Sequence, residues 1–111
     1  MAFQINLGGE GEISGVLNQQ GRWVVTAFGW RSSQTGESIA ELVRSRHDFL
    51  IADNVALPLP DRVADEVITN NIPPVDSITW LGPTVQSSEI RRILKSGGRW
   101  IHNGVVRFIK P

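Results

Sequence analysis

The chain has 111 residues, of which 41% are apolar and 20% charged, and its 11 basic and 11 acidic residues give a formal net charge of zero. This length predicts a single domain spanning residues 1–111, and the composition excludes a generally disordered chain. Zero net charge disfavours a strong electrostatic grip on nucleic acid or on an anionic membrane. The lack of cysteine excludes disulfides, thiolate metal sites and a cysteine nucleophile.

Targeting signals and metal ligands are both sparse in this sequence. No apolar run approaches 18 residues and residues 1–4 do not begin a signal peptide, so we expect a soluble, cytoplasmic domain with no membrane partner. A larger parent chain and a homo-oligomer both stay open as partners. The only two histidines, His47 and His102, are expected at opposite edges of the sheet, so no metal site is predicted.

Short apolar runs alternate with two helical patterns along the chain. Strands are expected at residues 3–7, 23–28, 48–53, 66–69, 100–102 and 105–109. Continuous apolar runs of this length are typical of strands covered on both faces, as in a parallel sheet. Asn103-Gly104 between the last two runs predicts a type I′ turn, and therefore a C-terminal antiparallel hairpin.

Two helices are expected between these strands. The first is predicted to follow a cap at Thr35. Its buried stripe is expected to be Ile39, Leu42 and Val43. The second is predicted to be capped by Ser87 or Ser88 and to stop at Gly97. This order of elements predicts an α/β fold with few helices and a mostly parallel sheet, whose ligand crevice lies at the carboxyl ends of the strands.

A glycine-rich segment follows the first predicted strand. Gly9, Gly11 and Ser14 match the spacing G-x-G-x-x-small, which turns tightly and lets backbone approach a ligand, although ordinary turns use glycine too. Glu10 and Glu12 beside a pyrophosphate would repel it, whereas a cationic group would be attracted. S-adenosylmethionine carries an ammonium, a sulfonium and no phosphate, so it suits this loop better than NAD or ATP. The alternative is that both glutamates are simply solvated.

Three segments of the second half share the spacing of a known family. They are residues 52–61 (ADNVALPLPD), residues 64–70 (ADEVITN) and residues 89–100 (EIRRILKSGGRW). Together they resemble the class I S-adenosylmethionine-dependent methyltransferases, the last segment being similar to the family's Glu-x-x-Arg-Val-Leu-Lys-Pro-Gly-Gly helix and strand. The similarity spans residues 48–101 and extends weakly over residues 7–11. It implies a small Rossmann-like sheet that binds S-adenosylmethionine.

The resemblance also implies which positions contact this cofactor. The positions are Gly8, Gly9, Glu10, Gly11, Asp53, Asn54, Val55 and Thr69. Gly9 and Gly11 match the loop that approaches the methionine part and the ribose. Asp53 matches the acid that hydrogen-bonds the adenine amino group, with Asn54 and Val55 beside the ring.

The same resemblance points to two candidate catalytic residues, Asn70 and Asn71. Asn71-Ile72-Pro73-Pro74 loosely resembles the Asn-Pro-Pro-aromatic motif of amino-group methyltransferases, in which the asparagine side chain accepts a hydrogen bond from the target amine. The extra Ile72 and the missing aromatic residue depart from that motif, and a proline pair after a strand also serves as a simple loop stop. Trp30 and Trp80 lie near predicted loop ends, where they can stack on an adenine or pack on the sheet.

Other departures keep three interpretations open. Only residues 12–20 are available for the helix that normally follows the glycine loop, Gly15 interrupts them, and no carboxylate ends the second predicted strand. The first interpretation is a methyltransferase acting on a small molecule or protein. The second is a non-catalytic interaction module of the same origin. The third is a bacterial toxin effector domain that acts on a nucleotide or RNA and is neutralised by a cognate immunity protein. An open, polar pocket beside Gly9 and Asp53 would support an enzyme, and a filled one a module.

Overall fold

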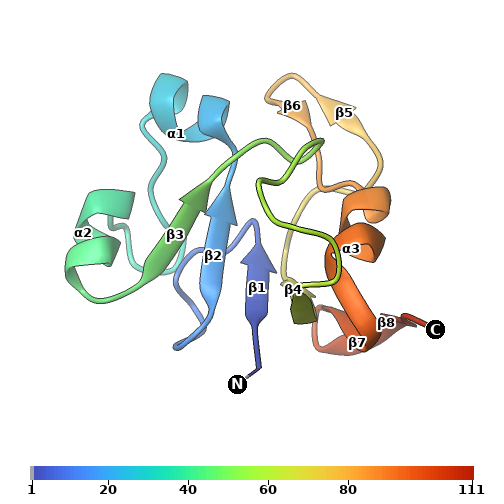
Figure 1. Cartoon of the computed structure of the whole chain (residues 1–111). Helices are drawn as coiled ribbons and strands as arrows, with labels where there is room; N and C mark the ends of the chain where they lie inside the picture. The colour runs from blue at the N-terminus through green and yellow to red at the C-terminus, as the bar shows by residue number, and fades with distance from the viewer. Residues whose placement is uncertain (1) are drawn as a thin grey trace.

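The computed structural model describes residues 2–111, and the side chains of these residues apart from those at positions 27 and 28. Its main sheet has six strands in the order β3-β2-β1-β4-β7-β8 (Figure 1). The strands are β1 (Gln4–Leu7), β2 (Leu17–Gln20), β3 (Asp48–Ile51), β4 (Ala64–Thr69), β7 (Leu94–His102) and β8 (Val105–Ile109). The first five in spatial order run parallel and β8 runs antiparallel to β7. The predicted α/β class, with a mostly parallel sheet and a C-terminal hairpin, is confirmed.

Few helices accompany this sheet, as expected. They are α1 (Arg22–Phe28), α2 (Ile39–Arg44) and α3 (Ser87–Ile93), and a small separate hairpin is formed by β5 (Ile78–Thr79) and β6 (Gly82–Pro83). In Figure 1 the arrowheads of β1, β2 and β3 point toward the end of the molecule where α1 and the β5–β6 hairpin lie. None of the helices within residues 2–111 is long and apolar enough to cross a membrane.

The apolar core lies where the central strands meet α3. Ile5 of β1 pairs with Val67 of β4, and both side chains are fully buried. Ile90 and Ile93 bring the apolar face of α3 into the same cluster, and both are also fully buried. Burial of such side chains stabilises the fold by about 1.5–3 kcal/mol each. The core thus fixes the central strands, from whose carboxyl ends the candidate site is built.

The prediction for the second strand was wrong. Residues 23–28 form most of α1, which begins after Gly21 and ends at Gly29 in the left-handed region (φ 58°), whereas the second strand is β2. The reason is that three of the four β2 residues, Asn18, Gln19 and Gln20, are polar and nevertheless buried. Each donates a side-chain hydrogen bond to a backbone carbonyl, so the strand is covered on both sides without being apolar.

The first predicted helix has a different cap and a narrower buried stripe. Ser38, not Thr35, is the N-cap of α2: its hydroxyl accepts a hydrogen bond from the Glu41 amide, and the Glu41 carboxylate accepts one from the Ser38 amide. This reciprocal capping box satisfies two otherwise unpaired donors. Leu42 is buried as expected, but Val43 is exposed.

The second predicted helix begins near the expected residue and ends early. It starts at Ser87, whose amide and hydroxyl both donate to the Asp76 carboxylate, at 2.8 and 2.7 Å. The cap therefore comes from a distant aspartate rather than from Ser87 or Ser88. The helix ends at Ile93, and Gly97 (φ 79°) lies inside β7, where the pairing register with β4 shifts.

The hairpin turn between β7 and β8 gives a direct test of local backbone strain. Asn103 and Gly104 both have positive φ, 49° and 80°, as a type I′ turn requires. A Cβ at Gly104 would meet no atom within 4 Å, so Gly104→Ala adds only the left-handed strain, about 1 kcal/mol of lost stability. Gly21→Ala is the control, since Gly21 has φ −67°. Urea unfolding that shows equal stabilities for the two variants would contradict this reading of the turn.

Candidate functional site

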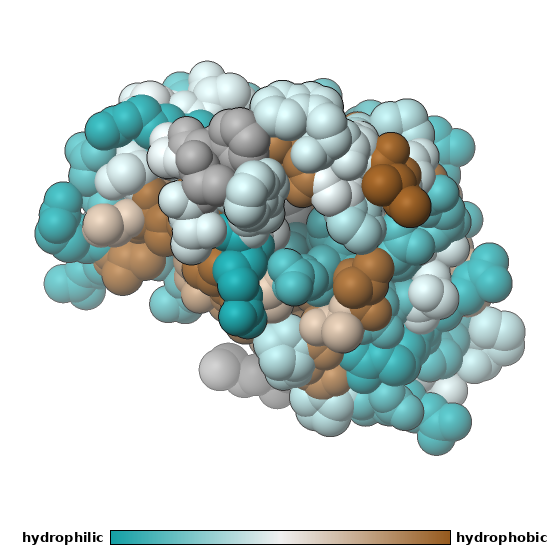
Figure 2. Space-filling model, turned by 90° about the horizontal axis from the view of Figure 1, so that it is seen from above, coloured by the Kyte–Doolittle hydropathy of each residue, from teal (hydrophilic) through white to brown (hydrophobic). Residues whose placement is uncertain are grey.

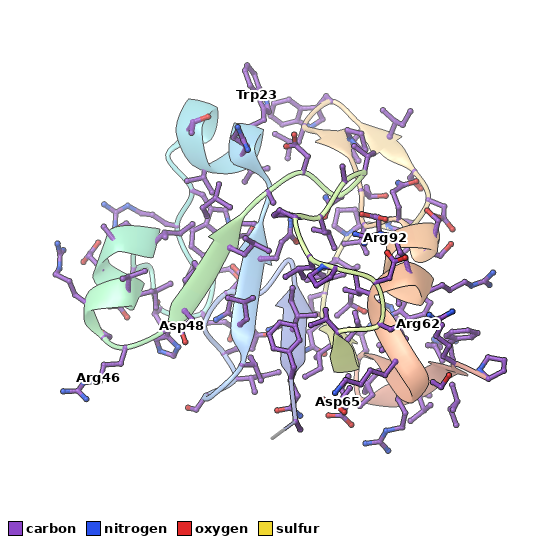
Figure 3. The ribbon with its side chains drawn as sticks, viewed as in Figure 1. Trp23, Arg46, Asp48, Arg62, Asp65 and Arg92 are labelled. Atoms are coloured by element: carbon purple, nitrogen blue, oxygen red, sulfur yellow. The ribbon has the colours of Figure 1, made fainter. Side chains whose placement is uncertain are left out.

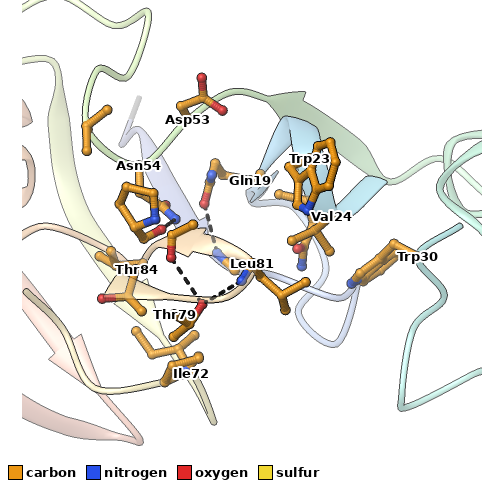
Figure 4. A pocket seen from close by; sticks show the side chains of 18 of the residues that line it. Gln19, Trp23, Val24, Trp30, Asp53, Asn54, Ile72, Thr79, Leu81 and Thr84 are labelled. Atoms are coloured by element: carbon orange, nitrogen blue, oxygen red, sulfur yellow. Dashed lines mark hydrogen bonds between the residues drawn. The ribbon is translucent and has the colours of Figure 1, made fainter. Parts of the chain in front are cut away.

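A cavity of about 800 Å³ lies at the carboxyl ends of the central strands. Gly8 follows β1, Gln20 ends β2, Asp53 follows β3 and Asn71 follows β4, and all four line the cavity. The opposite wall comes from α1 and from the β5–β6 hairpin. Figure 4 shows Trp23, Val24 and Trp30 on one side, Asn54, Thr84 and Ile72 on the other, and Asp53 at the rim. The crevice is therefore where a parallel α/β sheet places its ligand site.

Side chains of β2 tie the neighbouring strand ends together at the floor of this cavity. Gln19 accepts a hydrogen bond from the Gly8 amide (3.1 Å) and donates one to the Ala52 carbonyl (2.8 Å). Gln20 donates to the Gly9 carbonyl at 2.9 Å. Because these amide groups are buried and hydrogen-bonded, they fix the ends of β1, β2 and β3 relative to one another.

Only the first glycine of the loop faces the cavity. Gly8 lines it, whereas Gly9 and Gly11 do not. A Cβ at Gly9 would overlap the Asn18 Oδ1 atom and lie 2.8 Å from Asn6 Cγ. The missing side chain of Gly9 therefore makes room for polar side chains of the sheet. The space beside Gly9 is filled by side chains of the sheet, and at Gly8 a Cβ would lie 2.8 Å from Ile72 Cγ2, a side chain that lines the cavity.

The backbone amides of the glycine loop are all used within the chain. The Gly8 amide donates to Gln19, and the next three amides donate to the Asn6 carbonyl (3.1 Å), the Glu12 carboxylate (2.8 Å) and Asn18 Oδ1 (3.3 Å). A phosphate-binding loop instead leaves such amides free to point at its ligand. The loop of this chain is consequently not built to cradle an anion.

The two loop glutamates hold the loop in place and are not simply solvated. The Glu10 carboxylate accepts hydrogen bonds from the Ser33 amide and hydroxyl, both at 2.7 Å. Glu12 accepts from Asn6 (2.9 Å) and Asn70 (3.3 Å). Partial burial raises the pKa of Glu12, but the hydrogen bonds from Asn6, the Glu10 amide and Asn70 outweigh burial, so the pKa lies below its ordinary value. Both carboxylates are thus engaged in hydrogen bonds that shape the loop.

The charged side chains in the described lining of the cavity are all negative. Among the described residues that line it, Glu10 and Asp53 are acidic, and there is no lysine, arginine or histidine. Asp53 is exposed, and its carboxylate makes no hydrogen bond or ion pair with the part of the chain that the structure describes. Asp53 is therefore available to a ligand, and Glu10 adds a second negative charge to the lining.

Three tryptophans give the cavity aromatic walls. Trp23 comes from α1, Trp80 from the turn between β5 and β6, and Trp30 from the segment after α1. Trp23 and Trp80 are exposed, and Trp30 packs edge-on against Phe49 with ring centroids 6.0 Å apart. Figure 2 looks onto this end of the molecule, where apolar side chains stand among hydrophilic ones. Tryptophan faces bind planar rings and cations, so the walls complement the acidic groups.

Asn54 contributes a buried acceptor to the same wall. Its Nδ2 group donates to the Pro83 carbonyl at 3.1 Å, which links the loop after β3 to β6. Its Oδ1 atom is buried and has no hydrogen-bond partner among the described residues. An unpaired buried acceptor costs about 1–3 kcal/mol, and an N–H donor from a ligand would relieve that cost.

The structure brings together six of the ten sequence-predicted site residues. Those that line the cavity are Gly8, Glu10, Asp53, Asn54, Val55 and Asn71, and those that do not are Gly9, Gly11, Thr69 and Asn70. Thr69 is fully buried and bonds to Trp100 and His102. The Asn70 side chain donates to Glu12. Of the two candidate catalytic asparagines, only Asn71 reaches the cavity.

Sequence reasoning missed two parts of the site. Gln19 and Gln20 carry the floor, and the signal that points to them is a polar pair directly before Gly21, where a strand end meets a turn. The β5–β6 hairpin had no such signal, because its strands have only two residues each. Trp30 and Trp80 both line the cavity, and Trp30 also packs on Phe49 of β3, so both alternatives stated for these tryptophans stay open.

The site thus combines a position at strand carboxyl ends, a described lining with two carboxylates and no basic side chain, and three tryptophans. The residues that line the cavity define its chemistry. Comparison with protein-family models, with curated proteins and with solved structures found no match to this chain.

Proposed function

We propose that the chain is a Rossmann-like, S-adenosylmethionine-binding domain of methyltransferase type that transfers a methyl group to an acceptor. The observation that carries the proposal is the acidic, tryptophan-lined cavity without a basic residue. The strand order supports it, because β3-β2-β1-β4-β7 follows the 3-2-1-4-5 order of doubly wound sheets. Those sheets bind ligands where the order reverses, which here is between β1 and β4.

Charge selects among the adenine-containing ligands that such a sheet can hold. Two unit charges 4 Å apart near a protein surface interact by about 4 kcal/mol. With Asp53 and Glu10 at the opening, that energy opposes a triphosphate or pyrophosphate and favours a sulfonium or an ammonium. S-adenosylmethionine has both cations and no phosphate, so it fits the charge of the cavity where ATP and NAD do not.

Size and hydrogen bonding fit the same cofactor. A volume of about 800 Å³ lies within the range of about 300–1,000 Å³ that small-molecule sites occupy. The Asp53 carboxylate and the unpaired Asn54 Oδ1 atom are acceptors, as the adenine amino group requires. Trp23 and Trp30 offer faces for the ring.

The roles of this chain's residues are binding and orientation. When bound, S-adenosylmethionine supplies an activated methyl group. Asp53 and Asn54 hold the adenosine part of the cofactor. Asn71 positions the methyl acceptor, and its backbone amide donates to Asn103 Oδ1 at 2.9 Å, which fixes its place. Placing two reactants in line is worth several kcal/mol without acid–base groups, which suits a cavity whose described lining has no histidine.

Two observations favour a second candidate, a non-catalytic interaction module. The amides of residues 8–11 are all satisfied within the chain, and the described chain between β1 and β2 contains no helix. A domain that has lost its cofactor contacts would have these two features. The two candidates differ in whether S-adenosylmethionine binds at all.

Asp53→Asn tests the proposal with a control on the same strand. Asp53 lies just past the carboxyl end of β3 and Asp48 at its start, away from the cavity (Figure 3). By isothermal titration we expect micromolar binding of S-adenosylmethionine to the wild type, at least tenfold weaker binding to Asp53→Asn, and unchanged binding to Asp48→Asn. Absence of heat with the wild type would favour the interaction module. Equal affinities for the two variants would remove Asp53 from the site.

A further inference from the structure

A second cavity, of about 610 Å³, lies next to the first and shares only Ile72 and Pro73 with it. Its remaining lining residues are Pro74, Val75, Trp100, His102 and Arg107. The lining within the described chain therefore contains one arginine, one histidine and no carboxylate. This polarity is opposite to that of the first cavity.

Hydrogen bonds to both ring nitrogens orient the imidazole of His102. Asn103 Oδ1 accepts from the Asn71 backbone amide at 2.9 Å, so the Nδ2 group of Asn103 is the one that faces His102 Nε2, at 3.3 Å. On the other side of the ring, Nδ1 lies 2.7 Å from Thr69 Oγ1.

A buried partner holds this ring in place. Thr69 is fully buried, and its hydroxyl oxygen also accepts from Trp100 Nε1 at 2.9 Å. Thr69 and His102 face each other across the β4–β7 pair. The imidazole is thus oriented by the sheet, with Nε2 on the exposed side. The Asn103 contact to Nε2 is long and exposed, so a better-aligned polar group of a ligand can replace it.

Arg107 supplies the cation of this cavity. It lies on β8, is exposed, and makes no hydrogen bond or ion pair with any residue that the structure describes. The walls between the arginine and the histidine are apolar or aromatic: Ile72, Pro73, Pro74, Val75 and Trp100. A ligand that satisfies all three features needs an anion, a hydroxyl, which can donate to or accept from the imidazole, and a flat apolar body.

We propose that the second cavity is a binding site for a small hydroxylated aromatic acid. Its carboxylate pairs with the Arg107 guanidinium, its hydroxyl hydrogen-bonds to His102 Nε2, and its ring packs against Trp100 and the proline pair. The site is independent of what occupies the first cavity. Binding here is therefore expected whether or not S-adenosylmethionine binds.

Three probes separate the contributions of the two polar groups. They are 4-hydroxybenzoate, benzoate, which lacks the hydroxyl, and phenol, which lacks the carboxylate. In NMR titrations of the full chain, 4-hydroxybenzoate is expected to shift the Trp100 indole N–H resonance and to saturate below about 1 mM. Benzoate and phenol are each expected to bind at least tenfold more weakly. Equal binding of the three probes, or no binding of any, would overturn the proposal.

Variants of two exposed arginines assign the anion contact. Arg107→Gln is expected to remove the preference for 4-hydroxybenzoate over phenol while leaving phenol binding unchanged. Arg46→Gln is the control, since Arg46 lies by the β3 edge, at the opposite edge of the sheet from β8 (Figure 3). Equal effects of the two arginine variants would contradict the assignment.

Discussion

Replacing Ile90 by alanine is expected to lower the free energy of unfolding by about 2–5 kcal/mol. Ile90 is fully buried on α3, in the core cluster that includes Ile5 and Val67 of the central strands. Its truncation removes apolar burial and leaves a cavity that the surrounding strands fill only in part. Domains of this size are stable by about 5–15 kcal/mol, so the loss would be a large share of the total.

Urea unfolding measures this loss, and an isoleucine of the small hairpin supplies the control. Ile78 of β5 is 84% exposed, so Ile78→Ala is expected to change stability by less than about 0.5 kcal/mol. Similar unfolding midpoints for Ile90→Ala and Ile78→Ala would contradict the packing of α3 on the sheet.

A second large loss, of about 3 kcal/mol, is expected for Glu89→Ala. The Glu89 carboxylate is nearly buried and accepts from the Leu57 amide and from Arg92 Nε, both at 2.7 Å. Arg92 in turn donates to the carbonyls of Leu57 (3.0 Å) and Leu59 (2.7 Å). The pair therefore fastens the proline loop after β3 to α3. Removing the carboxylate leaves the Leu57 amide unpaired and the guanidinium without its nearest anion.

The same pair makes stability depend on pH. Hydrogen bonds from Arg92 to the Glu89 carboxylate hold the pKa of Glu89 below its ordinary value, although partial burial of this carboxylate acts in the opposite direction. The pKa of Glu89 is then lower in the folded protein than in the unfolded chain. Its contribution to stability is therefore fully present at pH values above the unfolded-chain pKa and is lost as the pH falls through the folded-state pKa. Between pH 7 and pH 3 the urea midpoint should decrease more for the wild type than for Glu89→Gln, whose side chain keeps an acceptor for the Leu57 amide. Equal falls would contradict the role of the charge.

The fold could be predicted where strands coincide with short apolar runs, both in buried β4 and in the largely exposed β8. The strands β3, β4, β7 and β8 follow apolar runs, and the Asn103-Gly104 turn follows from its residue types. β2 could not be found in this way, because its polar residues are buried through hydrogen bonds to neighbouring strands and loops. Those partners are distant in sequence, so no local pattern contains the information.

The site could be predicted in part for a topological reason. Residues that follow parallel strands converge at one edge of the sheet, and Gly8, Asp53 and Asn71 meet there. Glycine spacing carries less information, because a missing Cβ makes room equally for a ligand or for a neighbouring side chain. At Gly9 the neighbour is Asn18, across the β1–β2 pair.

The zero net charge of the chain conceals an uneven distribution. The first cavity has two carboxylates and no cation in its described lining, and the second has Arg107 and no carboxylate in its own. The net charge of the whole chain averages over the two cavities. It disfavours a highly charged macromolecular partner but does not indicate the charge of a small ligand in either cavity. Local sign, not net charge, determines which ligand each cavity favours.

The central claim, that the first cavity selects a cationic adenosine ligand, is tested most directly by one titration series on the wild-type chain. Isothermal titration would compare S-adenosylmethionine, S-adenosylhomocysteine and ATP under one buffer and salt condition. We predict micromolar binding of S-adenosylmethionine, at least tenfold weaker binding of S-adenosylhomocysteine, which lacks the sulfonium charge, and no heat with ATP. Binding of ATP as tight as that of S-adenosylmethionine, or no binding of either adenosyl ligand, would contradict the account.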